Sequence, residues 1–190
     1  MIGARADVAE KKQEAQILLD LVSEVSARPE SIVRAAILKS AHMLLLYNAI
    51  ESTTTIVLER IHDVLAREQY SDLRPEIRKL WTEYFFQRHS EKSRFGHLEG
   101  TIRGEAKFPR LSDFLDHVNL FSGNLDGRAI SELLAKYGIG SLNTVDRAKL
   151  LDIKSKRNRI AHGEEMFKEA CRNYTVGEMG SYQAACFNAL

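Results

Sequence analysis

The feature that most constrains the fold is a long stretch without helix-breaking residues. From Glu30 to about Arg67 the chain contains no proline and no glycine, so nothing there interrupts an α-helix. Residues 35–50 are apolar on nearly every side of a helix, which is typical of a helix surrounded by partners. The sequence therefore predicts one very long buried helix, or two collinear ones. The β-branched run Thr53–Thr55 lowers helix propensity and favours a bend or break there.

The rest of the chain carries further helical segments. Three prolines and 11 glycines in 190 residues are few, and residues with high helix propensity are abundant, which favours an all-α fold. Segment 89–110 contains three glycines, Pro109 and weak periodicity, and it is predicted to be an exposed loop. We expect a single domain over residues 1–190. Periodicity and stop signals predict helices at about residues 6–27, 71–88, 111–120, 127–137 and 145–162, and from about residue 176.

Charge and residue content argue against several classes of protein. Lys plus Arg total 27 against 26 for Asp plus Glu, so the net charge of +1 gives no global case for nucleic-acid binding. Two cysteines, Cys171 and Cys186, are too few for a disulfide framework and are more typical of core filling. The histidines lack metal-ligand spacing, and no glycine-rich phosphate loop is present. We expect no metal and no cofactor. The histidines concerned are His42, His62, His89, His97 and His117.

The N-terminal region bears on location. The first twenty residues are too rich in charge for the apolar core of a signal peptide. The most apolar stretch, residues 41–50, is far shorter than the roughly 20 residues of a membrane-spanning helix. We therefore expect a cytoplasmic protein without a membrane span.

One predicted helix concentrates positive charge. Between Arg147 and Arg159 it carries six basic residues and a single acid, Asp152. Such a cluster can bind phosphate groups. Charge alone nevertheless favours an ordinary solvated helix, because short basic runs are common on exposed helices and basic residues near the C-terminus suit the helix dipole. The basic residues are Arg147, Lys149, Lys154, Lys156, Arg157 and Arg159.

The end of this helix carries a motif. Arg157 is followed after four residues by His162 and then by Gly163. This pattern resembles the Arg-x4-His motif of the HEPN superfamily, and Glu51 is similar to the acidic position on an early helix of that family. The stretch 124–139 also resembles stand-alone bacterial HEPN-like nucleases. The resemblance covers about residues 31–176 and implies a HEPN-like helical bundle with long central helices, which acts as a metal-independent endoribonuclease, often a toxin or defence effector.

Helix geometry limits how the motif residues can cooperate. At about 100° per residue, Asn158 and His162 share a helix face, whereas Arg157 and His162 lie about 140° apart. Arg157 can therefore reach a phosphate at His162 through its long side chain, through the helix end at Gly163, or with a second subunit that completes the site. The resemblance also implies a homodimer with a composite site, so geometry and family pattern agree.

The resemblance further implies a role for each residue. His162 would act as general base or acid on the RNA 2′-hydroxyl, and Arg157 would hold the phosphate. Asn158 would orient the imidazole, and Glu51 would support the site. The products would carry a 2′,3′-cyclic phosphate and a 5′-hydroxyl. Further RNA-binding residues would be Arg159, Lys156 and Lys154.

Other functions remain open at this point. Many HEPN-like domains are non-catalytic modules for dimerisation or interaction, and a nucleotide or small ligand could bind between helices. A toxin would also imply an antitoxin protein as partner. In the predicted loop, Phe95 and Phe108 could stack on single-stranded RNA, although an ordinary exposed loop is the preferred interpretation.

Overall fold

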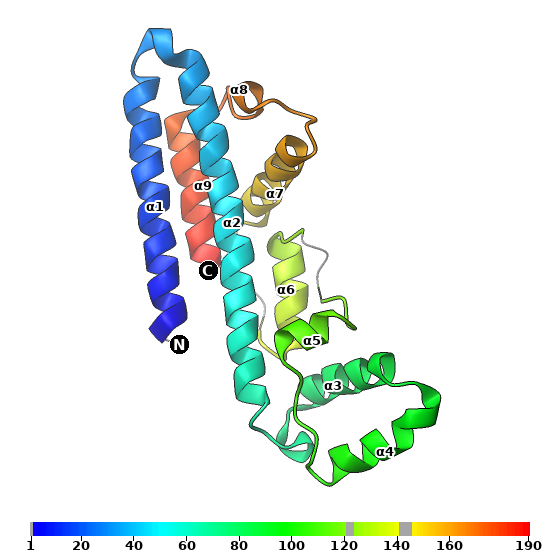
Figure 1. Cartoon of the computed structure of the whole chain (residues 1–190). Helices are drawn as coiled ribbons and strands as arrows, with labels where there is room; N and C mark the ends of the chain where they lie inside the picture. Colours follow the sequence, from blue (N-terminus) through cyan, green and yellow to red (C-terminus); the bar gives the residue numbers. More distant parts are fainter. Residues whose placement is uncertain (1, 121–123, 141–145) are drawn as a thin grey trace. The chain divides into compact units, whose positions relative to one another are not determined.

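The computed structural model describes residues 2–120, 124–140 and 146–190. These residues form nine α-helices and two 3-10 turns, with no strand among them, which confirms the all-α prediction (Figure 1). The helices are α1 (Ile2–Ser26), α2 (Ile32–Leu65), α3 (Pro75–Arg88), α4 (Glu91–Ile102), α5 (Leu111–Leu115), α6 (Gly127–Lys136), α7 (Arg147–Ala161), α8 (Phe167–Ala170) and α9 (Val176–Ala189). The 3-10 turns are Pro29–Ser31 and Tyr70–Asp72.

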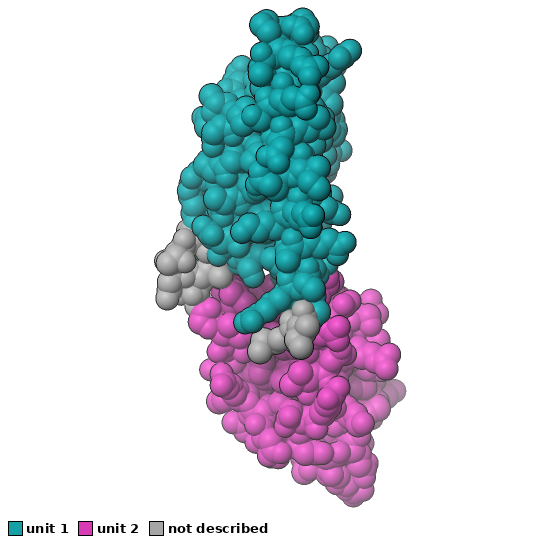
Figure 2. Space-filling view, turned by 90° about the vertical axis from the view of Figure 1, so that its left-hand side faces the viewer, with its two compact units in different colours: residues 1–54, 124–128, 142–190 teal, residues 55–123, 129–141 magenta. Residues whose placement is uncertain are grey.

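The chain divides into two compact units, coloured teal and magenta in Figure 2. Unit 1 consists of residues 1–54, 124–128 and 142–190, and unit 2 of residues 55–123 and 129–141. That residues 1–190 act as one HEPN-like domain stays a prediction.

Unit 1 is built on α1, the first half of α2, and α9, which lie side by side (Figure 1). A chain of buried polar groups links the three helices. The Gln183 amide on α9 donates to Gln16 Oε1 on α1 at 2.8 Å, and His42 Nε2 on α2 donates to Gln183 Oε1 at 2.9 Å. Burial lowers the pKa of His42. His42 is thus a hydrogen-bonded core histidine.

Helix α2 is a single unbroken helix, so the expected interruption at Thr53–Thr55 is absent. The hydroxyl of Thr54 donates to the carbonyl of Ile50 at 2.8 Å, and Thr53 is buried. Bonding back to the preceding turn and packing compensate for the low intrinsic helix propensity of this run. The boundary between the two units falls within the same run, after Thr54.

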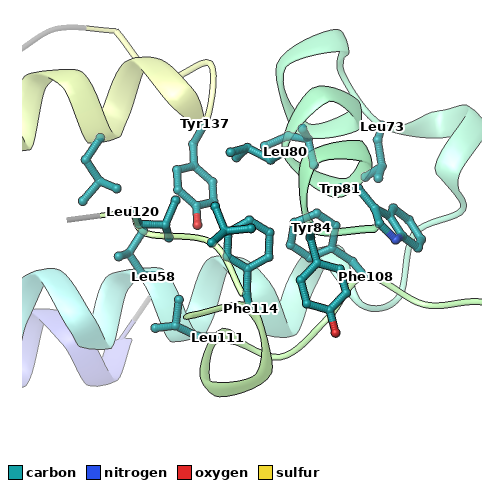
Figure 3. Close-up of a cluster of buried hydrophobic side chains, with 13 residues drawn as sticks. Leu58, Leu73, Leu80, Trp81, Tyr84, Phe108, Leu111, Phe114, Leu120 and Tyr137 are labelled. Carbon is teal, nitrogen blue, oxygen red and sulfur yellow. The ribbon is translucent and has the colours of Figure 1, made fainter. Parts of the chain in front are cut away.

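Unit 2 has an aromatic core supplied by the second half of α2, by α3, by α5 and by the segments around them (Figure 3). The side chain of Tyr137 points into this cluster from the end of α6. The apolar stripe predicted for α3 is confirmed, although the helix begins at Pro75 rather than Ser71. The buried core residues are Leu58, Leu73, Ile77, Leu80, Trp81, Tyr84, Phe108, Leu111, Phe114, Val118, Leu120, Leu133 and Tyr137.

The loop expected at about residues 89–110 is wrong over much of its length, because α4 occupies Glu91–Ile102. Only Thr101 is buried on this helix, so its sequence shows little periodicity. Gly96 costs helix stability but faces open space, so no packing contact depends on it. Phe108 is buried in the core of unit 2, which removes it as a base-stacking residue, whereas Phe95 is 77% exposed.

Candidate functional site

Helix α7, within unit 1, carries the motif. Its N-terminus is capped by Asp146, whose side chain accepts from the Lys149 N–H at 3.1 Å. Buried Leu150 and Ile153 fix the face that packs inward. Asn143 and Thr144 are also residue types that favour helix N-caps, but they lie outside the described residues.

The C-terminus of α7 places His162 at the surface. The helix ends at Ala161, His162 is the exposed C-cap residue, and its backbone N–H donates to the Asn158 carbonyl at 2.9 Å. Gly163 follows with φ +72°, the left-handed conformation that glycine adopts without strain. Within the described residues the imidazole has no hydrogen bond or ion pair, so it is open to a ligand from solvent.

Arg157 is held by three groups. Its Nη1 donates to Asn158 Oδ1 at 2.9 Å, its Cζ lies 4.4 Å from the centre of the Tyr47 ring, and its Nη2 is 3.8 Å from Glu51 Oε2. The Tyr47 ring is fully buried and therefore held rigidly, so the cation–π contact restrains the Arg157 guanidinium. Tyr47 and Glu51 are four residues apart on α2 and so share a helix face. The structure therefore brings Arg157, Asn158 and Glu51 together.

Both polar atoms of the Asn158 side chain form hydrogen bonds, but neither of these bonds is to the His162 ring. Its Oδ1 accepts from Arg157, and its Nδ2 donates to Asn124 Oδ1 at 2.8 Å. Next to Asn124, the Leu125 N–H donates to the Tyr47 hydroxyl at 3.3 Å. Asn158 thus orients Arg157, whereas its predicted action on the imidazole is limited here to the backbone hydrogen bond.

The remaining basic residues of the motif region are paired with acids. Lys154 Nζ contacts Asp126 Oδ2 at 2.5 Å. Glu165 contacts both Lys156, at 3.3 Å, and Arg159, at 2.8 Å. The basic cluster predicted for this helix is therefore partly neutralised by nearby acidic side chains.

Two residues of this arrangement escaped sequence reasoning, Tyr47 and Glu165. Tyr47 had a usable signal, because it lies one helical turn before Glu51. Glu165 had none, since its contacts depend on how the chain turns after Gly163.

The hydroxyl groups of Tyr174, just before α9, and of Tyr182 on α9 connect this part of the chain to α7. Both donate to Asp152 Oδ2, at 2.7 and 2.5 Å. Burial, followed by the bond to Asp152, raises the pKa of Tyr182 to about 12, so this hydroxyl keeps its proton at neutral pH. The lone acid of the basic helix is therefore structural.

The described parts of the chain carry neither a metal-site arrangement nor a membrane-spanning helix. No group of three or more His, Cys, Asp or Glu side chains there is arranged to hold a metal ion. No described helix combines the length and the apolar character needed to cross a bilayer.

Comparison with known proteins supports the resemblance seen in the motif. A family model described as HEPN_MAE_28990-like HEPN matches residues 5–190. Neither the curated proteins nor the solved structures gave a match. Since the family model covers nearly the whole chain, this protein belongs to the HEPN_MAE_28990-like HEPN family.

Proposed function

We propose that this protein is a metal-independent endoribonuclease of HEPN type. The observation that carries the proposal is the end of α7, where Arg157, held over the Tyr47 ring, and the exposed His162 have the Arg-x4-His spacing. HEPN domains are often ribonucleases, and the chemistry of these two side chains suits phosphodiester cleavage.

In the proposed reaction RNA supplies its own nucleophile. His162 takes the proton of the 2′-hydroxyl, the 2′-oxygen attacks phosphorus, and the bond from phosphorus to the 5′-oxygen breaks. The 5′-oxygen leaves with a proton from a second imidazole, and Arg157 stabilises the negative charge on the phosphoryl oxygens. The products carry a 2′,3′-cyclic phosphate and a 5′-hydroxyl.

A homodimer supplies the second imidazole in this proposal. The Arg157 guanidinium contacts Tyr47 and Glu51, and Arg157 lies about 140° around the helix from His162, so the two side chains of one α7 point in different directions. Two copies that bring their α7 ends together would place an arginine and a histidine from different chains at one phosphate. We further propose that the enzyme acts in the cytoplasm as a toxin or defence effector, restrained by an antitoxin protein.

The test is RNA cleavage by the purified protein in the presence of EDTA. We expect cleavage by the wild type, with 2′,3′-cyclic phosphate ends, and at least a 100-fold loss in His162→Ala and in Arg157→Ala, because acid–base catalysis and charge stabilisation each contribute roughly 100-fold or more. Arg172→Ala and His97→Ala, which remove an exposed arginine and an exposed histidine elsewhere, serve as matched controls and should cleave normally.

The pairing of the α7 cations with acids favours a second candidate, a non-catalytic helical module for dimerisation or interaction. Compensated cations bind polyanions less strongly than free ones. RNA that stays intact at high concentrations of a dimeric wild-type protein would support the module and refute the nuclease.

A further inference from the structure

The side chain of Glu165 occupies a small cationic fork on α7. Its carboxylate lies 2.8 Å from the Arg159 guanidinium and 3.3 Å from the Lys156 ammonium. The Glu165 and Lys156 side chains are only 18% and 15% exposed, whereas the Arg159 side chain is 50% exposed. The fork is therefore a partly desolvated place for one oxyanion, held between a planar donor group and a point charge.

The turn that carries Glu165 does not depend on this carboxylate. The backbone N–H groups of Glu164 and Glu165 donate to the Arg159 carbonyl at 2.8 and 3.1 Å, and Gly163 adopts φ +72°. These backbone features close the end of the helix by themselves. The Glu165 side chain can consequently leave the fork while the turn stays in place.

The backbone positions of the two cations also stay in place when the carboxylate leaves. Lys156 and Arg159 belong to a regular helix, three residues apart, and therefore neighbour each other on its surface. The Lys156 ammonium in addition lies 5.7 Å from the centre of the Tyr174 ring. A second anion would thus find the Lys156 ammonium close to its present position, with Arg159 one turn further along the same helix face.

An anion at this end of a helix is bound against the helix dipole, whose negative end lies at the C-terminus. Its binding depends on the two side-chain cations alone. A carboxylate and a phosphodiester oxygen meet this requirement in the same way, with a single negative charge and lone pairs that accept from N–H groups.

We propose that Lys156 and Arg159 form a phosphate subsite for the RNA backbone, and that the Glu165 carboxylate fills it while RNA is absent. Glu165 then competes with RNA and weakens its binding. The subsite rests on the proposed function only in that RNA supplies the phosphate, and it requires no cleavage.

The experiment measures binding of a labelled single-stranded RNA whose sugars are all 2′-O-methylated, so that cleavage cannot occur. Fluorescence anisotropy compares the full-length wild type with Glu165→Gln. We expect Glu165→Gln to bind RNA about 3- to 10-fold more tightly. RNA no longer has to break the ion pairs of Glu165, and breaking a partly exposed ion pair lowers affinity by up to about 10-fold. The slope of log K against log salt should steepen by about 1 to 2, one for each cation freed.

Glu164→Gln is the matched control. It makes the same charge change one residue away, at an exposed side chain that contacts neither Lys156 nor Arg159 in the described structure. It should tighten binding less than 2-fold. Glu165→Asp keeps the charge but shortens the side chain, and should give a smaller gain than Glu165→Gln in the same direction; it also provides the test should Glu165→Gln not fold.

Several outcomes would overturn the subsite. These are equal gains in the Glu164→Gln and Glu165→Gln proteins, weaker binding when Glu165 is replaced, and no RNA binding by any variant. A gain that persists when Lys156→Gln is added to Glu165→Gln would do so as well. Binding that responds as expected in a protein that cleaves no RNA would leave the subsite standing and refute the nuclease alone, so the two proposals fail separately.

Discussion

The hydrogen bond between His62 and Tyr137 in the core of unit 2 provides a sharp test of the fold. His62 is 1% exposed, and its Nδ1 lies 2.8 Å from the Pro109 carbonyl, which can only accept. The Nδ1 atom therefore carries the proton. In a neutral ring Nε2 must then accept, and the Tyr137 hydroxyl lies 2.7 Å from it. Both ring nitrogens are thus satisfied inside an apolar cluster.

Tyr137→Phe removes the only donor to Nε2 seen in the described structure and leaves a buried acceptor unpaired. Such an orphaned group costs about 1–3 kcal/mol, so we expect the free energy of unfolding of unit 2 to fall by about 2 kcal/mol at pH 7.5. Urea unfolding followed by tryptophan fluorescence measures this change, because Trp81 is the single tryptophan and is 3% exposed in the same core. Tyr70→Phe, whose half-buried hydroxyl lies 3.1 Å from that of Thr82, is the control and should cost less than about 1 kcal/mol.

The same core predicts a pH dependence. Burial lowers the pKa of His62 below the ordinary imidazole value. The folded state therefore prefers the neutral ring, and the stability it gains is complete above the unfolded pKa of about 6.5 and lost as the pH falls through and below it. Between pH 6.5 and 5.5 the loss should be at most about 1 kcal/mol, because half of the unfolded molecules already carry the protonated ring at pH 6.5. A Tyr137→Phe protein as stable as the wild type, or a Trp81 transition that does not move between these pH values, would refute this account of the core.

Three further predictions concern unit 1. Tyr47→Leu removes the ring beneath the motif arginine and should slow the proposed RNA cleavage about 5-fold, since a half-buried cation–π contact is worth about 1 kcal/mol; Tyr47→Phe, which keeps the ring, should lose less, and the reverse order would contradict the contact. Asp152→Ala leaves the hydroxyls of Tyr174 and Tyr182 without their acceptor and should lower the unfolding free energy by about 2–3 kcal/mol in calorimetry; an unchanged transition would show that the bonds contribute nothing. Burial raises the pKa of Cys186 to about 12, so its thiol should resist a thiol-reactive reagent at pH 8 until denaturant is added; immediate labelling would contradict its burial.

The sequence predicted the large features of the fold because they depend on local signals. The absence of helix breakers between Glu30 and Arg67 predicted α2, and Gly163 predicted the end of α7. It failed at α4, where a helix with one buried residue shows no periodicity and two internal glycines imitate a loop. Exposure of an element, more than its length, decided whether its pattern could be recognised.

The motif residues were predicted for a different reason. Arg157 and Asn158 are neighbours in sequence, and their contact follows from local geometry. Glu51 was expected near the motif only from the family resemblance, and its contact with Arg157, 106 positions away in the sequence, was not predicted. Tyr47 shows the limit of such reasoning: it is the only Phe, Tyr or Trp in α2 and lies one turn before Glu51, but only the packing of α7 shows that Arg157 lies over its ring.

The charge balance of the site depends on tertiary structure alone. The sequence places four cations on the last turns of α7, and the structure sets three carboxylates from three separate segments against them, Glu51, Asp126 and Glu165. Four positive and three negative charges leave a local net charge of +1, so the attraction for RNA is far smaller than the basic run alone predicts. In the proposed function, RNA binding is then an exchange of one anion for another at each cation. In such an exchange, removal of the Glu165 carboxylate should change the affinity for RNA more than the addition of a nearby lysine. The removal both frees two cations and eliminates the group that competes with the RNA phosphate.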